Sequence, residues 1–262
     1  MKIVTTTVRN ALCALGLLGL VKRHYYVWCD QFGAEKAKNL LQGIICPRDL
    51  VFDIGAFIGS RTFLFASMGA QVVAVEPQPV CLDILRKRFE KNPRISIVAG
   101  LVSRSPGEAD LWVDDQVPEI ASIRKEWVCD GPTRVKGARV YPLRVESHTL
   151  DALISEYGKP KYIKIDAEGH EREILQGLSC SCEFISFEIH RGDRQKLIEC
   201  IQEVKRLGAY DANLSLGDSD VFVFSEWQTI EAFLAWSWPE EAPEFGDLFL
   251  HLGLGPKVRP IH

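Results

Sequence analysis

The chain has 262 residues, of which 47% are hydrophobic and 25% are charged, a composition typical of globular proteins. This length suits one large domain, or one domain with extensions, and it can bury a sizeable core. The formal net charge of −4 excludes the strongly basic balance of a nucleic-acid-binding domain. We therefore expect no nucleic-acid partner.

An apolar run at residues 11–21 lies near the N-terminus. A membrane-spanning helix needs about 20 apolar residues, so this run is too short to cross a bilayer. Lys2 and Arg9 precede it, as in a secretory signal, but basic residues follow it at once and no small-residue cleavage site is visible. We assign residues 1–48 to a helical extension that packs on the protein. A weak membrane-surface contact or a signal is the alternative.

Short apolar runs alternate with helical patterns from residue 49 onward, which favours βαβ units and a parallel sheet. Sheet strands are expected at 50–54, 71–76, 95–99, 161–166, 184–190, 210–215 and 221–225, the last two forming an antiparallel hairpin. Helices are expected at 59–68, 79–91, 148–157, 171–176 and 193–207, and two further strands at 108–113 and 139–145. The pattern predicts a Rossmann-like α/β fold with a mostly parallel seven-stranded sheet, helices on both faces and an antiparallel edge hairpin.

The C-terminal residues 226–262 differ in composition from the rest, because they concentrate Trp227, Trp236 and Trp238 with several prolines. So much aromatic surface is unstable in water, so we expect this Trp-rich extension to pack on a domain of residues 49–225. A homodimer contact or a lid over the substrate is the alternative. The eight cysteines form no C-x-x-C pair, which indicates free thiols in a reducing, cytoplasmic compartment.

The turn after the first strand has the strongest functional signal, the segment Asp53-Ile-Gly-Ala-Phe-Ile-Gly59 followed by Thr62. In open α/β sheets, ligands bind beyond the carboxyl ends of the strands, where a Gly-rich turn brings backbone N–H groups close to them. The spacing of Gly55 and Gly59 is not the G-x-G-x-x-G fingerprint of dinucleotide binding. The loop indicates a cofactor without a pyrophosphate, and a plain tight turn is the alternative.

Glu76 ends the second strand, 23 residues after Asp53, and Pro77 follows it. An acidic residue near that distance hydrogen-bonds a ribose diol in nucleotide-binding folds. A solvated carboxylate at a strand end is the alternative. Because the glycine loop precedes it, we favour ribose binding.

Two further strand ends contribute charged side chains. Asp166 and Glu168 follow the strand that contains Lys164. A lone buried charge is costly, so Lys164 should have an acidic partner, for which Glu188 is the candidate. Lys164 either only bridges strands or also orders the site. His190 ends the next strand and is a candidate general base, because imidazole titrates near neutrality; a plain hydrogen-bonding role is the alternative.

A divalent cation of the Mg²⁺ type is the remaining option at these strand ends. Asp166, Glu168, Glu188 and His190 together could supply its ligands. We assign no metal to the site.

Four motifs together resemble the FkbM-type methyltransferases over residues 50–207. In chain order they are D-I-G-A-x-I-G-x-x-T, V-x-A-x-E-P, L-D-x-L at 150–153 and I-K-I-D-x-E-G-x-E. The resemblance implies a class I Rossmann-like methyltransferase fold and S-adenosylmethionine as cofactor. It also implies methyl transfer to a hydroxyl of a small molecule or glycan, typically a sugar or other natural product. The family usually has Asn where this chain has Phe57, which removes a side-chain hydrogen bond from the loop.

The resemblance also implies roles for residues of this chain. Asp53, Gly55 and Gly59 would line the methionine end of the cofactor, Glu76 would hold the ribose, and Gly100 and Leu101 would flank the adenine. Ala56, Thr62, Pro77 and Asp166 complete the expected cofactor-binding set. The expected catalytic residues are His190 as first choice of base, Glu168 as second, and Lys164. An NAD-linked oxidoreductase and a non-catalytic interaction module are the rival interpretations.

Overall fold

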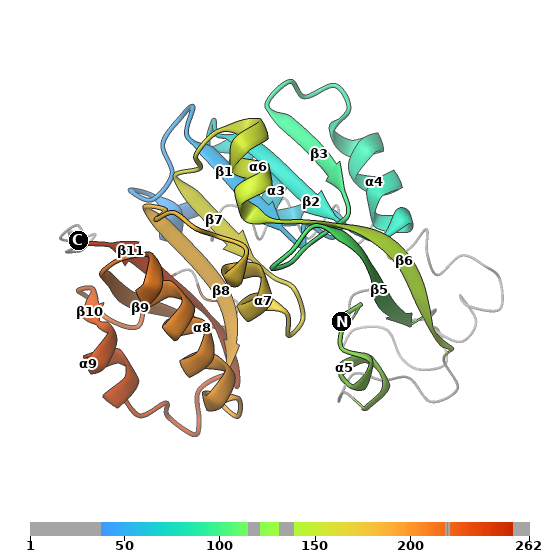
Figure 1. The fold of residues 1–262 in the computed structure, drawn as a ribbon. Helices are drawn as coiled ribbons and strands as arrows, with labels where there is room; N and C mark the ends of the chain where they lie inside the picture. Colours follow the sequence, from blue (N-terminus) through green and yellow to red (C-terminus); the bar gives the residue numbers. More distant parts are fainter. Residues whose placement is uncertain (1–37, 115–120, 131–138, 218, 220, 254–262) are drawn as a thin grey trace, which may run out of the picture.

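The computed structural model describes residues 38–114, 121–130, 139–217, 219 and 221–253. Its larger sheet has eight strands in the order β10-β9-β11-β8-β7-β1-β2-β3 (Figure 1). The parallel part consists of β1 (Leu50–Ile54), β2 (Gln71–Glu76), β3 (Ile95–Ala99), β7 (Tyr162–Ile165) and β8 (Phe184–His190). The antiparallel part consists of β9 (Tyr210–Leu216), β10 (Gln228–Thr229) and β11 (Phe245–Leu252).

Helices separate the parallel strands along the chain. They are α3 (Ser60–Ser67), α4 (Pro79–Phe89), α6 (Leu150–Tyr157), α7 (Glu171–Gln176) and α8 (Arg194–Leu207), with α9 (Ile230–Ala235) after β10. Local sequence explains two of their starts. Pro79 occupies the first turn of α4, where its missing N–H costs nothing, and the Thr149 side chain caps α6 by accepting from the Ala152 N–H.

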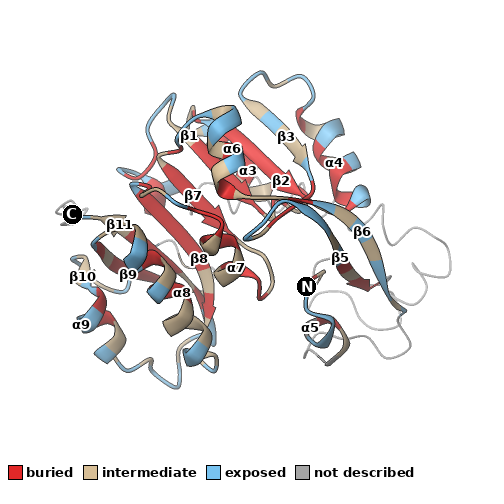
Figure 2. Ribbon diagram, viewed as in Figure 1, coloured by how far each residue is buried: buried red, intermediate tan, exposed pale blue. Residues whose placement is uncertain are grey.

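Both faces of the central sheet are covered, so its middle strands are buried almost throughout (Figure 2). Val51 and Val72 pack with α3 in one core cluster, whereas Phe52 and Val73 belong to a second cluster that includes residues of α6, α7 and α8. Neighbouring residues of one strand point to opposite faces, which accounts for the division. This is why the strands read as continuous apolar runs in the sequence.

The Rossmann-like fold with an antiparallel edge is confirmed, but one expected strand was wrong. Residues 221–225 form no strand; they run beside β9, where the Asn213 side chain bonds the backbone N–H and C=O of Phe224. The antiparallel neighbour of β9 is instead β11, which comes from the Trp-rich segment and lies between β8 and β9. The main sheet therefore has eight strands, and a strand that returns from so far along the chain leaves no local turn signal.

A second sheet projects from the first and has the order β4-β6-β5 (Figure 1). Its strands are β4 (Leu101–Val102), β5 (Gly107–Asp114) and β6 (Val140–His148). The short helix α5 (Lys125–Asp130) follows β5, and Ser122 forms an isolated antiparallel bridge with Trp112 of β5. The small sheet begins just after the end of β3, at β4.

The N-terminal extension falls largely on residues 1–37, which lie outside the described part of the chain. Its last residues do pack on the domain, since Leu40, Leu41, Ile44 and Ile45 are buried in the core cluster of α3. Within the described residues, no helix combines the length and the apolar character needed to cross a membrane. The six described cysteines are all free thiols.

Candidate active site

A cavity of about 270 Å³ opens at the carboxyl ends of β1, β2 and β7. This is the edge of an open α/β sheet at which ligands bind. Its wall includes seven residues that the sequence singles out: Gly55, Glu76, Pro77, Gly100, Leu101, Asp166 and Glu168. The rest of the lining includes Val102 and Leu111 of the small sheet and residues 121–123, which lie between β5 and α5.

The loop from β1 to α3 is shaped by glycines with positive φ. Gly55 has φ 80°, and a Cβ placed on it would lie 1.8 Å from the carbonyl oxygen of Asp166. Gly59 has φ 89°, and its Cβ would lie 2.4 Å from the Phe89 ring. Only glycine fits such positions without displacing its neighbours. Phe57 has φ 51°, a conformation in which Asn is more common than a bulky residue.

Glu76 connects this loop to β2. Its carboxylate accepts a hydrogen bond from the Phe57 N–H at 2.8 Å and another from the Gln78 N–H at 2.9 Å. The side chain is buried, and burial raises its pKa to about 8 even though both hydrogen bonds favour the charged form. Each carboxylate oxygen has two lone pairs, so Glu76 can still accept hydrogen bonds from a diol in the cavity.

Four residues of the expected cofactor set do not line the cavity: Asp53 and Thr62 behind the loop, and Ala56 and Gly59 within it. Asp53 is 1% exposed and accepts a hydrogen bond from the Thr62 hydroxyl at 2.5 Å. Burial raises the pKa of Asp53, against that hydrogen bond and the nearby Lys164 charge. This pair joins β1 to α3 and thereby holds the loop between them in place.

Lys164 lies inside β7 and is 3% exposed. Its Nζ is 2.9 Å from Asp166 Oδ2 and 3.9 Å from Asp247 Oδ1. The expected partner Glu188 was wrong as the closest acid, because Asp166, two residues along the chain, and Asp247 of β11 form the ion pairs with Lys164. Burial opposes the ionisation of Asp166, but the charge and hydrogen bond of Lys164, together with the charges of Arg61 and Lys196, outweigh it and lower the Asp166 pKa.

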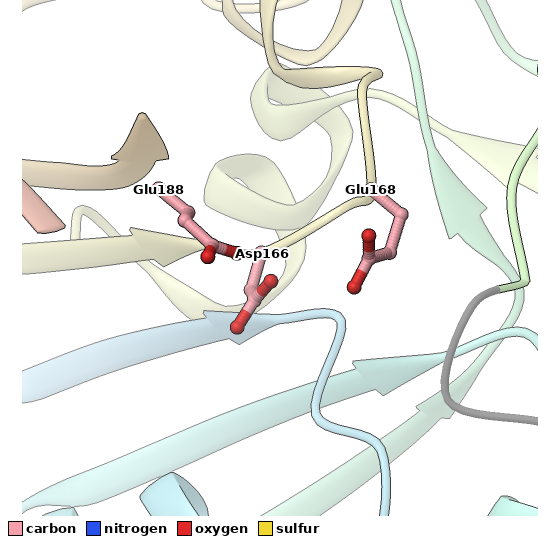
Figure 3. A group of neighbouring side chains, drawn as sticks. All are labelled: Asp166, Glu168 and Glu188. Atoms are coloured by element: carbon pink, nitrogen blue, oxygen red, sulfur yellow. The ribbon is translucent and has the colours of Figure 1, made fainter. Parts of the chain in front are cut away.

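Three carboxyl groups converge beside the cavity, as Figure 3 shows for Asp166, Glu168 and Glu188. Their carboxylate oxygens lie within 4.8 Å of one another. Burial raises the pKa of Glu188 to about 8, and the charges of Asp166 and Glu168 add to the increase. Oxygen groups of this kind suit a Mg²⁺-type cation, and a shared proton would relieve the same repulsion.

His190 is separated from the main cavity. It lines a small hollow with Asp193 and Lys196, and its Nε2 is 3.7 Å from Glu188 Oε1. Burial lowers the pKa of His190, so the neutral imidazole is favoured.

Two residues of the cavity wall were missed by sequence reasoning. His170 is buried, and its Nε2 is 3.0 Å from the Ser103 hydroxyl oxygen. Ser122 donates a hydrogen bond to the backbone carbonyl of Glu168 at 2.8 Å. His170 could have been noticed from its place in the D-A-E-G-H-E run, whereas Ser122 lies in an irregular segment without a motif.

The cavity suits S-adenosylmethionine in its chemistry. Gly55 brings backbone close to the cavity, Glu76 offers a buried carboxylate for a diol, and Asp166 and Glu168 offer negative charge for a sulfonium cation. Val75, Leu101 and Val102 add apolar wall for a purine ring. The three acidic residues of the wall would repel a pyrophosphate.

Comparison with known proteins gives the same assignment. The profile of the methyltransferase FkbM domain matches residues 53–224. The hexuronic acid methyltransferase AglP of Haloferax volcanii is 30% identical over 182 residues, which cover 67% of this chain and 71% of that protein. The methyltransferase sdnD of Sordaria araneosa is 28% identical over 154 residues, covering 49% and 60%.

Among solved structures, the O-methyltransferase from Bacillus cereus in complex with SAH aligns with a TM-score of 0.41 and 13% identity, over 84% of this chain and 80% of that one. The profile match spans well over half of the sequence, and it includes the glycine loop, Glu76 and the acidic strand ends. The chain belongs to the FkbM family of S-adenosylmethionine-dependent methyltransferases.

Proposed function

We propose that this methyltransferase transfers the methyl group to a hydroxyl oxygen of a sugar or other natural product. The observation that carries the proposal is the junction of the glycine loop with Glu76, whose carboxylate bonds the Phe57 and Gln78 N–H groups at the cavity wall. In that junction the Glu76 carboxylate, which would bind the ribose, lies next to a backbone turn with no room for a Cβ. Both features suit S-adenosylmethionine.

The roles of the cavity residues follow from their positions. Glu76 and Pro77 would hold the ribose, Gly100 and Leu101 would flank the adenine, and Gly55 with Asp166 would hold the methionine end. Asp53 and Thr62 would act through the loop, because they lie behind it. Bound S-adenosylmethionine supplies a methyl group on a sulfonium that is already activated, so the chain mainly aligns the acceptor and excludes water.

An alcohol acceptor must also lose its proton, for which a general base typically contributes about 10²–10⁴-fold. Glu168 is the favoured base, because it lines the cavity and belongs to the converging carboxyl groups. His190 is the second choice, because it does not line the cavity and contacts the converging carboxyl groups at Glu188. Lys164 would position Asp166 rather than touch the acceptor.

A sugar acceptor is supported by the similarity to AglP, whose name states that it acts on hexuronic acid. The small sheet and the segment at 121–123 would form the acceptor side of the cavity. Residues 115–120 and 131–138, in the irregular segment between β5 and β6, lie outside the described residues.

Calorimetry with S-adenosylmethionine and with NAD tests the cofactor, and mass spectrometry of a hydroxylated metabolite extract tests methyl transfer. We expect binding of the first ligand only, and products that are heavier by one methyl group. Binding of NAD without S-adenosylmethionine would contradict the proposal and favour the oxidoreductase. Binding without transfer to any hydroxylated compound would favour an interaction module, which the unusual Phe57 also motivates.

A further inference from the structure

Strand β11 brings a charged side chain next to Arg61 and Lys164 from outside the family match, which ends at residue 224. This side chain is Asp247, which is 17% exposed. Its Oδ2 lies 3.5 Å from Arg61 Nη2 on α3, and its Oδ1 lies 3.9 Å from Lys164 Nζ on β7. Asp247 therefore contacts cations from two elements that carry expected cofactor-binding residues.

Acids outnumber cations around Lys164. The two cations, Arg61 and Lys164, interact with the acids Asp53, Asp166 and Asp247, and Asp166 also lies close to the carboxyl groups of Glu168 and Glu188. Lys164 is almost fully buried, and a buried cation is costly unless acids are close to it.

Arg61 follows Gly59 by two residues in the chain, in the first turn of α3, and its guanidinium pairs with Asp247. Its side chain is 38% exposed, which gives it room to move if its acidic partner is removed. Without Asp247, Arg61 and Lys164 would both be left facing Asp166 and Asp53. The electrostatic potential around Asp166, which lines the cavity, would then become more positive, because interactions between charges are strong where water is largely excluded.

We propose that Asp247 is a positioning residue that balances Arg61 and Lys164, so that Asp166 keeps its negative charge available to the sulfonium end of S-adenosylmethionine. The inference rests on the proposed cofactor site. It makes the C-terminal strand a functional part of the site as well as a part of the sheet. S-adenosylhomocysteine serves as the probe of the charge, because it differs from S-adenosylmethionine only in lacking the methyl group and the sulfonium charge.

The test is calorimetry of Asp247→Asn with both ligands. We expect its affinity for S-adenosylmethionine to fall about tenfold and its affinity for S-adenosylhomocysteine to change less than about twofold. Asp247→Glu, which keeps the charge, should restore the preference. The matched control is Glu183→Gln, which removes an acid paired with Lys161 at the opposite end of β8 and should leave both affinities unchanged.

An equal loss of both affinities would overturn the inference, because it would indicate a structural role alone, and so would unchanged affinities. If Asp247→Asn does not fold, the double variant Arg61→Gln/Asp247→Asn removes one cation with the acid and should bind both ligands in the wild-type ratio. A changed ratio of the two affinities in that variant would contradict the inference that Asp247 acts by balancing Arg61. If the wild-type protein binds neither ligand, the proposed cofactor site itself has failed.

Discussion

Removal of the Glu76 carboxylate tests the ribose assignment directly. In Glu76→Ala, the backbone N–H groups of Phe57 and Gln78 lose their acceptor, and the diol of the cofactor loses its partner. An unsatisfied buried group costs about 1–3 kcal/mol, and water entering the open cavity offsets part of that cost. We expect the affinity for S-adenosylmethionine to fall by about 5–150-fold, which corresponds to the same range of free energy.

Isothermal titration calorimetry measures this loss, and circular dichroism with the melting temperature checks that the variant is folded. Glu76→Gln is the matched variant, since it keeps the shape and one acceptor oxygen and should bind with intermediate affinity. A 2′-deoxy analogue of the cofactor makes the test specific, because the wild type should discriminate against it and Glu76→Ala should not. The ribose assignment would be refuted if Glu76→Ala kept its affinity, or if both proteins discriminated equally.

Three further predictions address the loop, the base and the pH dependence. Gly55→Ala should abolish cofactor binding or prevent folding, because its Cβ would meet the Asp166 carbonyl oxygen at 1.8 Å. Gly43 has a similar φ but open space around it, so Gly43→Ala should lower the free energy of unfolding, measured by chemical denaturation, by only about 1–2 kcal/mol. Similar stability of the two variants would count against a loop closely packed on Asp166. Glu168→Gln should lower turnover by about 10²-fold or more with unchanged cofactor affinity, and more than His190→Ala does. A larger effect of His190→Ala in initial-rate assays would reverse that order. The raised pKa of Glu76 means that the folded protein holds a proton that the unfolded chain releases above its ordinary pKa of 4.5. The stability of the cofactor-free protein should therefore fall as the pH rises from about 4.5 to about 8. Denaturation curves of Glu76→Gln should show a smaller fall over that interval, and an identical one would argue against the shift.

The sequence by itself determined the parallel half of the fold and the cofactor edge. Strands β1, β2, β3 and β8 begin and end at the expected residues, because buried parallel strands leave continuous apolar runs between turn signals. Their carboxyl ends share one edge of the sheet, so the glycine loop, Glu76 and Asp166 could be placed around a common site before any coordinates were considered.

Only the tertiary structure decided how the antiparallel part completes that site. The distance along the chain from β9 to β11 hides their pairing, so a local hairpin was expected at residues 221–225 and Glu188 was expected to neutralise Lys164. Lys164 instead pairs with Asp166, two residues along the chain, and with Asp247, which the insertion of β11 between β8 and β9 brings near it. The buried cation needs acids close to it, and the second of these acids depends on the order of strands in space, which the local pattern of residues does not encode.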